Sequence, residues 1–210
     1  MKRVLATLAV GSLAVLATAC SGEAGQAEPE VSSASSSSAP SSSQASSGLP
    51  HSGAPAVDNP LPESAVSGDP CQALTPEQVK TALGDGASQG ERKDEPSLGP
   101  SCRWTHLSRQ SSMVVGFQTE PGDGLSSTYA NAKPQAEEFN EAAPIDGYPA
   151  VTYRMNTDMP MCTAMVGIAN EYAISVTGTL GVNAERNGTD PCEPVQQVAS
   201  WVVANLKAQS

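Results

Sequence analysis

The sequence predicts an α+β domain in which an antiparallel sheet of about five strands packs with two or three helices and is stapled by disulfides. Two helix-like segments, residues 73–84 and 190–210, enclose five short strand-like runs, and four cysteines are spread over both kinds of segment. We expect a single globular domain over residues 69–210, which is long enough to bury one core.

The N-terminus has the order of a secretory signal. Two basic residues precede the apolar run VLATLAVGSLAVLA, which is short for a membrane span, and small residues follow up to Cys20. The stretch LATAC resembles a bacterial lipobox, in which cleavage precedes a lipidated cysteine; Ala17 replaces the usual leucine, but small Ala19 fits cleavage. We predict a lipoprotein signal peptide over residues 1–19 and lipidation of Cys20, with an ordinary secreted protein as the alternative.

Residues 20–68 are dominated by serine, alanine, proline and glycine. Such a segment buries too little apolar surface to offset its ordering entropy, so we predict a disordered tether. With Gly/Ser statistics it spans about 40 Å root-mean-square and on the order of 160 Å at full stretch. The expected location is the extracytoplasmic face of the cell membrane, where the lipid anchor holds a domain that reaches into the cell wall.

The charge of the chain excludes one class of partner. The net charge is −11, and loss of the two basic residues with the signal makes it about −13. There is no basic patch with interleaved aromatic residues on which bases could stack, so no nucleic-acid partner is expected.

Cysteine usage favours disulfides over a metal site. Of five cysteines, setting Cys20 aside leaves Cys71, Cys102, Cys162 and Cys192, an even number in an exported chain. No two of them stand at C-x-x-C spacing, and His106 is the one histidine of the expected domain. We predict two disulfides and no metal or cofactor.

The first helix, within residues 73–84, has clear boundaries. Thr75 is the expected N-cap, Gln78 completes a capping box and Gly84 ends the helix. In the second, Asp190 is the expected N-cap with Glu193 three residues later. Its apolar residues recur at helical spacing, which predicts a core-facing stripe: Val195, Val198, Ala199, Val202, Val203 and Leu206.

The strand-like runs are rich in β-branched and aromatic residues and are separated by turn formers. The last two flank a hairpin turn at Asn170-Glu171. A third helix is predicted over residues 124–142, and Pro134 must break or restart it. The five runs are residues 102–107, 113–119, 148–154, 162–169 and 172–178.

The tripeptide Asp-Pro-Cys occurs twice, at residues 69–71 and 190–192, each time ahead of a helix, whereas Cys102 and Cys162 each begin a strand. We therefore pair Cys71 with Cys102 and Cys162 with Cys192, so that each disulfide fixes a helix start to the sheet. Loops of about 30 residues would each contribute roughly 3 to 4 kcal/mol. Pairing across the two halves stays open.

A family resemblance rests on these same residues. GDPCQALTPEQVKTALG, CRW, GYPAV, CTAMVGIANEYAISV and the final DPC before an apolar helix occur in this order and cover nearly the whole folded part. Together they resemble the actinobacterial lipoprotein family catalogued as domain of unknown function 3558. The resemblance implies a surface-exposed lipoprotein of the cell envelope, without an established activity and without catalytic residues to carry over.

Two patterns suggest chemistry. GASQG, residues 86–90, matches the G-x-S-x-G pattern of serine hydrolases, but it follows a helix end instead of a strand, so we interpret it as a flexible loop. His106 is interpreted as a strand-end residue on the face of Cys102 and Trp104. No catalytic residue is therefore assigned.

Four methionines, Met155, Met159, Met161 and Met165, cluster in MNTDMPMCTAM and could hold Cu(I) through their thioethers. In the competing interpretation Met165 packs in the sheet and the others line a loop. The sequence as a whole predicts a non-enzymatic surface lipoprotein that binds an envelope protein or a small apolar ligand. An enzyme without a recognisable motif and a methionine-based copper protein are the alternatives.

Overall fold

The structure is a computed structural model, and it describes residues 48–210. The predicted signal peptide, the predicted lipidation site Cys20 and residues 21–47 of the predicted tether lie outside the described residues.

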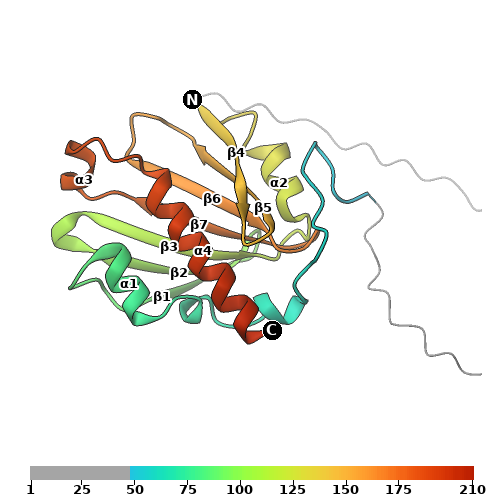
Figure 1. The fold of residues 1–210 in the computed structure, drawn as a ribbon, viewed down its shortest axis with the longest axis horizontal. Coiled ribbons are helices and arrows are strands. Elements are labelled where there is room, and N and C mark those ends of the chain that lie inside the picture. Colours follow the sequence, from blue (N-terminus) through green and yellow to red (C-terminus); the bar gives the residue numbers. More distant parts are fainter. Residues whose placement is uncertain (1–47) are drawn as a thin grey trace, which may run out of the picture. The chain divides into compact units, whose positions relative to one another are not determined.

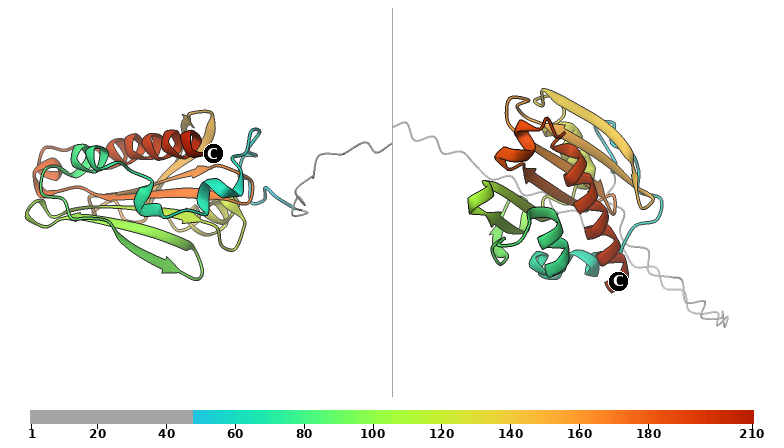
Figure 2. Two further views of the ribbon diagram at one scale, coloured as in Figure 1. Left: turned by 90° about the horizontal axis from the view of Figure 1, so that it is seen from below. Right: turned by 60° about the vertical axis from the view of Figure 1, so that its left-hand side comes forward.

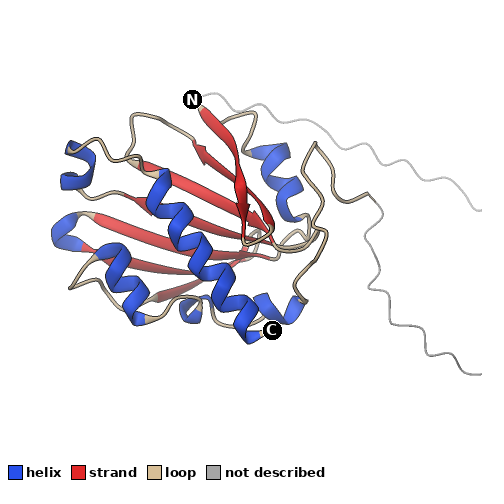
Figure 3. Cartoon of the chain, in the orientation of Figure 1, coloured by secondary structure: helices blue, strands red, loops and turns tan. Residues whose placement is uncertain are grey.

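A seven-stranded sheet is the centre of the domain (Figures 1 and 3). Its strand order is β1-β2-β3-β7-β6-β5-β4, and every neighbouring pair is antiparallel. The α+β class and the antiparallel sheet are thus confirmed. The strands are β1 (Glu91–Glu95), β2 (Gly99–His106), β3 (Ser111–Gln118), β4 (Glu138–Ile145), β5 (Tyr148–Arg154), β6 (Met161–Gly167) and β7 (Ala173–Thr179).

The sheet has two more strands than the five runs predicted, and both are edge strands. All five residues of β1 are exposed, so it lacks the apolar alternation by which a half-buried strand is recognised. β4 falls in the segment for which a helix was predicted: α2 ends at Asn131, before Pro134, and the chain continues as a strand instead of a second helix. The segment forms a strand because it pairs with β5, and its intrinsic secondary-structure propensity does not determine this.

Four α-helices occur in residues 48–210, and they cover the two faces of the sheet unequally. α1 and α4 lie on one face and α2 lies on the other (Figure 2). They are α1 (Pro76–Leu83), α2 (Gly124–Asn131), α3 (Val182–Arg186) and α4 (Cys192–Gln209), together with the 3₁₀ turns η1 (Glu63–Val66), η2 (Pro70–Gln72) and η3 (Leu107–Arg109).

The main core lies between the sheet and α4. Val166 and Val176 of the two central strands are fully buried, as are Val198 and Val202 of α4. Gly178 lets α4 approach β7 closely, because a Cβ at this position would lie 2.6 Å from Val195 Cγ2. All six residues of the predicted stripe of α4 are buried.

A smaller core lies on the opposite face, under α2. Leu125 and Tyr129 of this helix pack on Val151, Met165 and Ala173 of the sheet. The sheet is therefore buried on both faces near α2, which explains why β6 is buried at every position except Met161 and why β5 is buried over Ala150–Thr152.

Both predicted disulfides are present. Cys71 is joined to Cys102 and Cys162 to Cys192, across 31 and 30 residues respectively. Each therefore ties the start of a helical segment to a strand, and the cross-half alternative does not occur.

Residues 48–68, which the sequence assigned to the tether, pack on the domain. The His51 amide donates to Ser126 Oγ at 2.9 Å, and the Leu61 amide donates to Ile168 O at 2.8 Å. Val57 and Val66 are buried in the main core. The prediction of a disordered tether used the average composition of residues 20–68. That average hides the few apolar residues, such as Val57 and Val66, whose side chains are buried in the domain.

Candidate ligand-binding groove

A groove of about 700 Å³ opens between α1 and the loop of residues 84–90. One wall is the chain from Cys71 to Lys80, the other is the loop, and Trp104 of β2 lies between them. The volume is in the range of sites that hold small molecules.

Local sequence signals set the boundaries of the segments that line the groove. The chain leaves helical geometry after η2, and Thr75 is the N-cap of α1. The Thr75 hydroxyl accepts from the Gln78 amide at 3.2 Å, and Gln78 Oε1 accepts from the Thr75 amide at 2.8 Å. The predicted capping box is thus confirmed. Gly84 ends α1 with φ +96°, a conformation that favours glycine, and the chain turns back along the groove.

Residues 86–90 were interpreted as a flexible loop, but hydrogen bonds hold residues 85–88 against β2. The Ser88 amide donates to Thr105 O at 2.7 Å, and the Thr105 amide donates to Ser88 Oγ at 3.0 Å. The imidazole Nε2 of His106 bonds to Asp85 O at 2.7 Å. These hydrogen bonds hold the loop in place as one wall of the groove.

The floor of the groove is apolar. Trp104 is 4% exposed and belongs to the main core with Leu74 and Val79, and the Cys71–Cys102 disulfide lies beside it. A Cβ on Gly90 would lie 2.6 Å from Cys102 Sγ and 2.9 Å from Trp104 Nε1. Only glycine lets the loop come this close to the disulfide and the indole.

Among residues 48–210 the indole N–H of Trp104 has no hydrogen-bond acceptor. Its Nε1 is not one of the fully buried side-chain atoms that lack a partner. Trp104 lines the groove together with Gly90, whose added Cβ would lie 2.9 Å from Nε1. A buried tryptophan normally gives this proton to an acceptor. The described part of the protein therefore leaves a hydrogen-bond donor without a partner at the groove.

Two opposite charges on the rim neutralise each other. Lys80 Nζ lies 3.0 Å from Asp85 Oδ1, and this hydrogen bond, with the attraction of the carboxylate, raises the pKa of Lys80. Every other residue lining the groove is uncharged. The groove therefore has no net charge in a strongly acidic chain.

The serine of GASQG lines the groove, but the structure does not join it to the histidine as nucleophile and base. Ser88 Oγ bonds to the amide and hydroxyl of Thr105. Besides the Nε2 bond, His106 Nδ1 accepts from the Arg109 amide at 3.3 Å. His106 is the last residue of β2 and is 6% exposed, which confirms its place at a strand end on the buried face.

The four methionines do not share one environment. Met155 and Met159 are 41% and 49% exposed beside the β5–β6 turn, whereas Met165 is buried under α2, as the packing interpretation expected. Arg154 closes this turn through Nη2, which donates to Thr157 O at 2.6 Å and Met159 O at 2.9 Å.

The carboxylate of Glu137 has a structural role. Glu137 Oε2 accepts from the amide and hydroxyl of Thr157 at 2.7 and 2.9 Å, and the amide hydrogen bond is the main reason why the pKa of Glu137 is lowered. Within residues 48–210 no three His, Cys, Asp or Glu side chains gather as a metal site, and no helix is long and apolar enough to cross a membrane.

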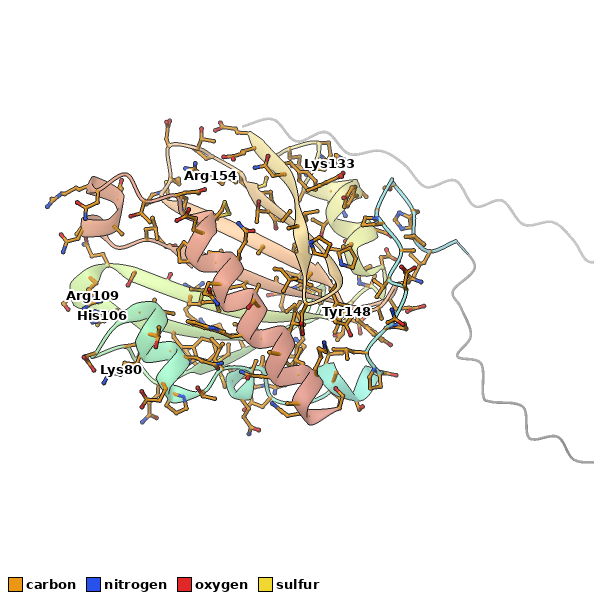
Figure 4. All side chains as sticks on the ribbon, viewed as in Figure 1. Lys80, His106, Arg109, Lys133, Tyr148 and Arg154 are labelled. Atoms are coloured by element: carbon orange, nitrogen blue, oxygen red, sulfur yellow. A yellow bond between two sulfur atoms is a disulfide. The ribbon has the colours of Figure 1, made fainter. Side chains whose placement is uncertain are left out.

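The groove and the N-terminal end of the described chain lie at opposite ends of the domain. Residues 51–57 attach to Ser126 of α2 and to Asn170 of the β6–β7 turn. Lys80 and His106 lie at the other end of the sheet, beside α1 (Figures 1 and 4).

The family described as Protein of unknown function (DUF3558) matches residues 15–205, so the chain belongs to this family. No curated protein and no solved structure matches the chain. Sequence reasoning placed Trp104 on the same face as Cys102 but missed the groove, because the groove depends on where the loop of residues 84–90 lies.

Proposed function

We propose that this protein is a non-enzymatic, lipid-anchored component of the cell envelope whose domain holds a small ligand in the Trp104 groove. The observation that carries the proposal is the indole N–H of an almost fully buried tryptophan that lines the groove and has no acceptor among residues 48–210. A protein partner inserting a side chain is the second occupant to consider, and the groove's size favours a small molecule.

The sequence and the fold support the location. The signal pattern with Cys20 predicts a lipid anchor, and two disulfides suit a chain that folds outside the cytoplasm. The chain enters the domain at the end opposite the groove. Attachment at that end leaves the groove unobstructed by the point where the tether joins the domain.

The anchor is tested with Cys20→Ala. We expect this variant to leave the membrane fraction and appear in detergent-free supernatant, because the lipid is attached through this cysteine. Ala17→Leu is the matched control, since it brings the lipobox closer to its usual form and should stay on the membrane. Retention of Cys20→Ala on the membrane would contradict the anchor.

Ligand binding is tested by native mass spectrometry of the domain, released from its own host's envelope by cleavage within residues 21–47. We expect an added small mass, absent from a Gln89→Trp variant in which the exposed Gln89 of the loop is replaced by a side chain that fills the groove. Ala143→Trp, at an exposed position of β4, is the control that should keep the mass. An added mass that survives Gln89→Trp would place the ligand elsewhere.

A further inference from the structure

We infer that the ligand is an uncharged molecule with an apolar body of two or more rings, or a comparable acyl body, and one hydrogen-bond acceptor that takes the N–H of Trp104. This inference rests on the proposed function, because it specifies what the same groove selects.

The apolar body follows from the floor. The indole, the disulfide and the side chains of Leu74 and Val79 present carbon and sulfur, and they are already packed into the core, so they stay in place when the groove is empty. A rigid apolar surface of this kind favours a ligand that buries carbon against it.

The acceptor follows from the free donor. In the empty groove, water can accept from Trp104 Nε1. A ligand that covers the indole expels this water, and a pure hydrocarbon would leave the N–H buried without a partner, which is costly. A carbonyl or ether oxygen placed over Nε1 removes that cost. The groove therefore discriminates between molecules of equal shape by the presence of one acceptor.

The expected absence of charge on the ligand follows from the two charged residues at the rim of the groove. Lys80 and Asp85 pair with each other at 3.0 Å, so a charged ligand gains a partner only by displacing this contact. An anion would also meet a chain of net charge −11, and a cation finds no uncompensated carboxylate among the residues lining the groove. A charged ligand would lose its hydration without a partner.

The test uses four probes of nearly the same shape: benzophenone, diphenylmethane, diphenylacetate and diphenylmethylammonium. The full chain is labelled with ¹⁵N, and the two indole N–H signals, from Trp104 and Trp201, are followed during titration. Trp201 lies on α4 and does not line the groove, so it is the internal control.

We expect benzophenone to move the Trp104 signal downfield and to saturate, with Trp201 unmoved. Diphenylmethane should bind about two- to tenfold more weakly, and the two ions more weakly still. In Trp104→Phe, which keeps an aromatic ring in the core but has no N–H, benzophenone should bind no better than diphenylmethane. Binding to this variant is followed by the amide signals of residues 84–90, and its unfolding curve shows that it is folded.

Two failures are distinguishable. If diphenylmethane or either ion binds as tightly as benzophenone, the inferred ligand class is wrong while the groove still binds ligands. If none of the four probes moves the Trp104 signal or the amides of the loop, the groove is not a binding site and the proposed function fails with it. Loss of all binding in Gln89→Trp confirms that the measured signal comes from the groove.

Discussion

The two Asp-Pro-Cys segments begin in the same way and end differently. In both, the aspartate Oδ1 accepts from the amide of the cysteine two residues later, at 3.0 Å for Asp69 and 2.9 Å for Asp190. Their disulfides close loops of nearly equal length, with Cα–Cα distances of 5.0 and 5.1 Å. The local structure of the tripeptide is therefore repeated.

The chain takes a different course after each of the two cysteines. Cys192 is the first residue of α4, which continues for 18 residues across the core, and both sulfur-bearing residues of its disulfide are buried. Cys71 lies in η2, which is only three residues long, and a new helix starts at Thr75 with its own capping box. Cys71 remains half-buried and lines the groove.

This contrast explains where the fold leaves room for a ligand. A continuous helix after the cysteine seals the core over its disulfide. After the interrupted helix Cys71 stays half-buried and lines the groove beside Trp104, and the loop of residues 84–90 forms the second wall. The same Asp-Pro-Cys turn thus precedes a buried disulfide at Cys192 and a partly accessible one at Cys71. Matched variants at the two positions should therefore differ in stability and in reactivity.

The largest expected effect comes from removing the disulfides. Cys162→Ala with Cys192→Ala should lower the free energy of unfolding by about 4 to 5 kcal/mol, and Cys71→Ala with Cys102→Ala by about 3 to 4 kcal/mol. The loop entropies are nearly equal, so the difference comes from lost packing at two buried residues instead of one buried and one half-buried. Urea denaturation of both variants measures it. A larger loss for the Cys71–Cys102 pair would contradict the comparison.

The second effect is on the rate of reduction. In the native protein a thiol reductant should reduce Cys71–Cys102 at least about tenfold faster than Cys162–Cys192, because an attacking thiolate must reach a sulfur and Cys71 lies beside the open groove. Alkylation at timed intervals, followed by peptide mapping, measures both rates. In denaturant the two rates should become similar. Simultaneous reduction of the native protein would show that the groove gives no access to its disulfide.

The fold was predictable where local signals and burial agree. The capping box of α1, the apolar stripe of α4 and both disulfide pairings could be deduced because each depends on residue identity at fixed spacing. Asp190 was placed one position off as the N-cap: α4 has Pro191 there, and the Asp190 carboxylate binds the Cys192 amide instead. Asp190 and Pro191 precede the helix, and only Cys192 of the tripeptide belongs to it.

The parts that were missed depend on tertiary contacts. β1 and β4 are strands because β2 and β5 pair with them, and their sequences carry no alternation that would show it. The groove is missed for the same reason. Trp104 was placed on the same face of its strand as Cys102, but the lack of an acceptor for its N–H among the described residues results from the position of a loop whose glycines and serine suggested only flexibility.

The smallest effect concerns the aspartates, where the two segments should behave alike. Asp69→Ala and Asp190→Ala should each lower the free energy of unfolding by about 1 kcal/mol, because each leaves the amide of a cysteine without its side-chain acceptor. The contact of Asp69 with Arg92, at 3.5 Å on the surface, adds little. Chemical denaturation of the two variants measures both losses.

Asparagine variants separate the hydrogen bond from the charge. Asp69→Asn and Asp190→Asn keep an oxygen that can accept from the cysteine amide, so each should retain most of the stability that alanine loses. If asparagine costs as much as alanine at both sites, the carboxylate charge and not the amide hydrogen bond fixes the turn. If only Asp190→Ala lowers the free energy of unfolding, the same hydrogen bond contributes unequally to stability at the two sites. It is then needed where the cysteine begins a long helix, and it is dispensable where Thr75 caps the following helix.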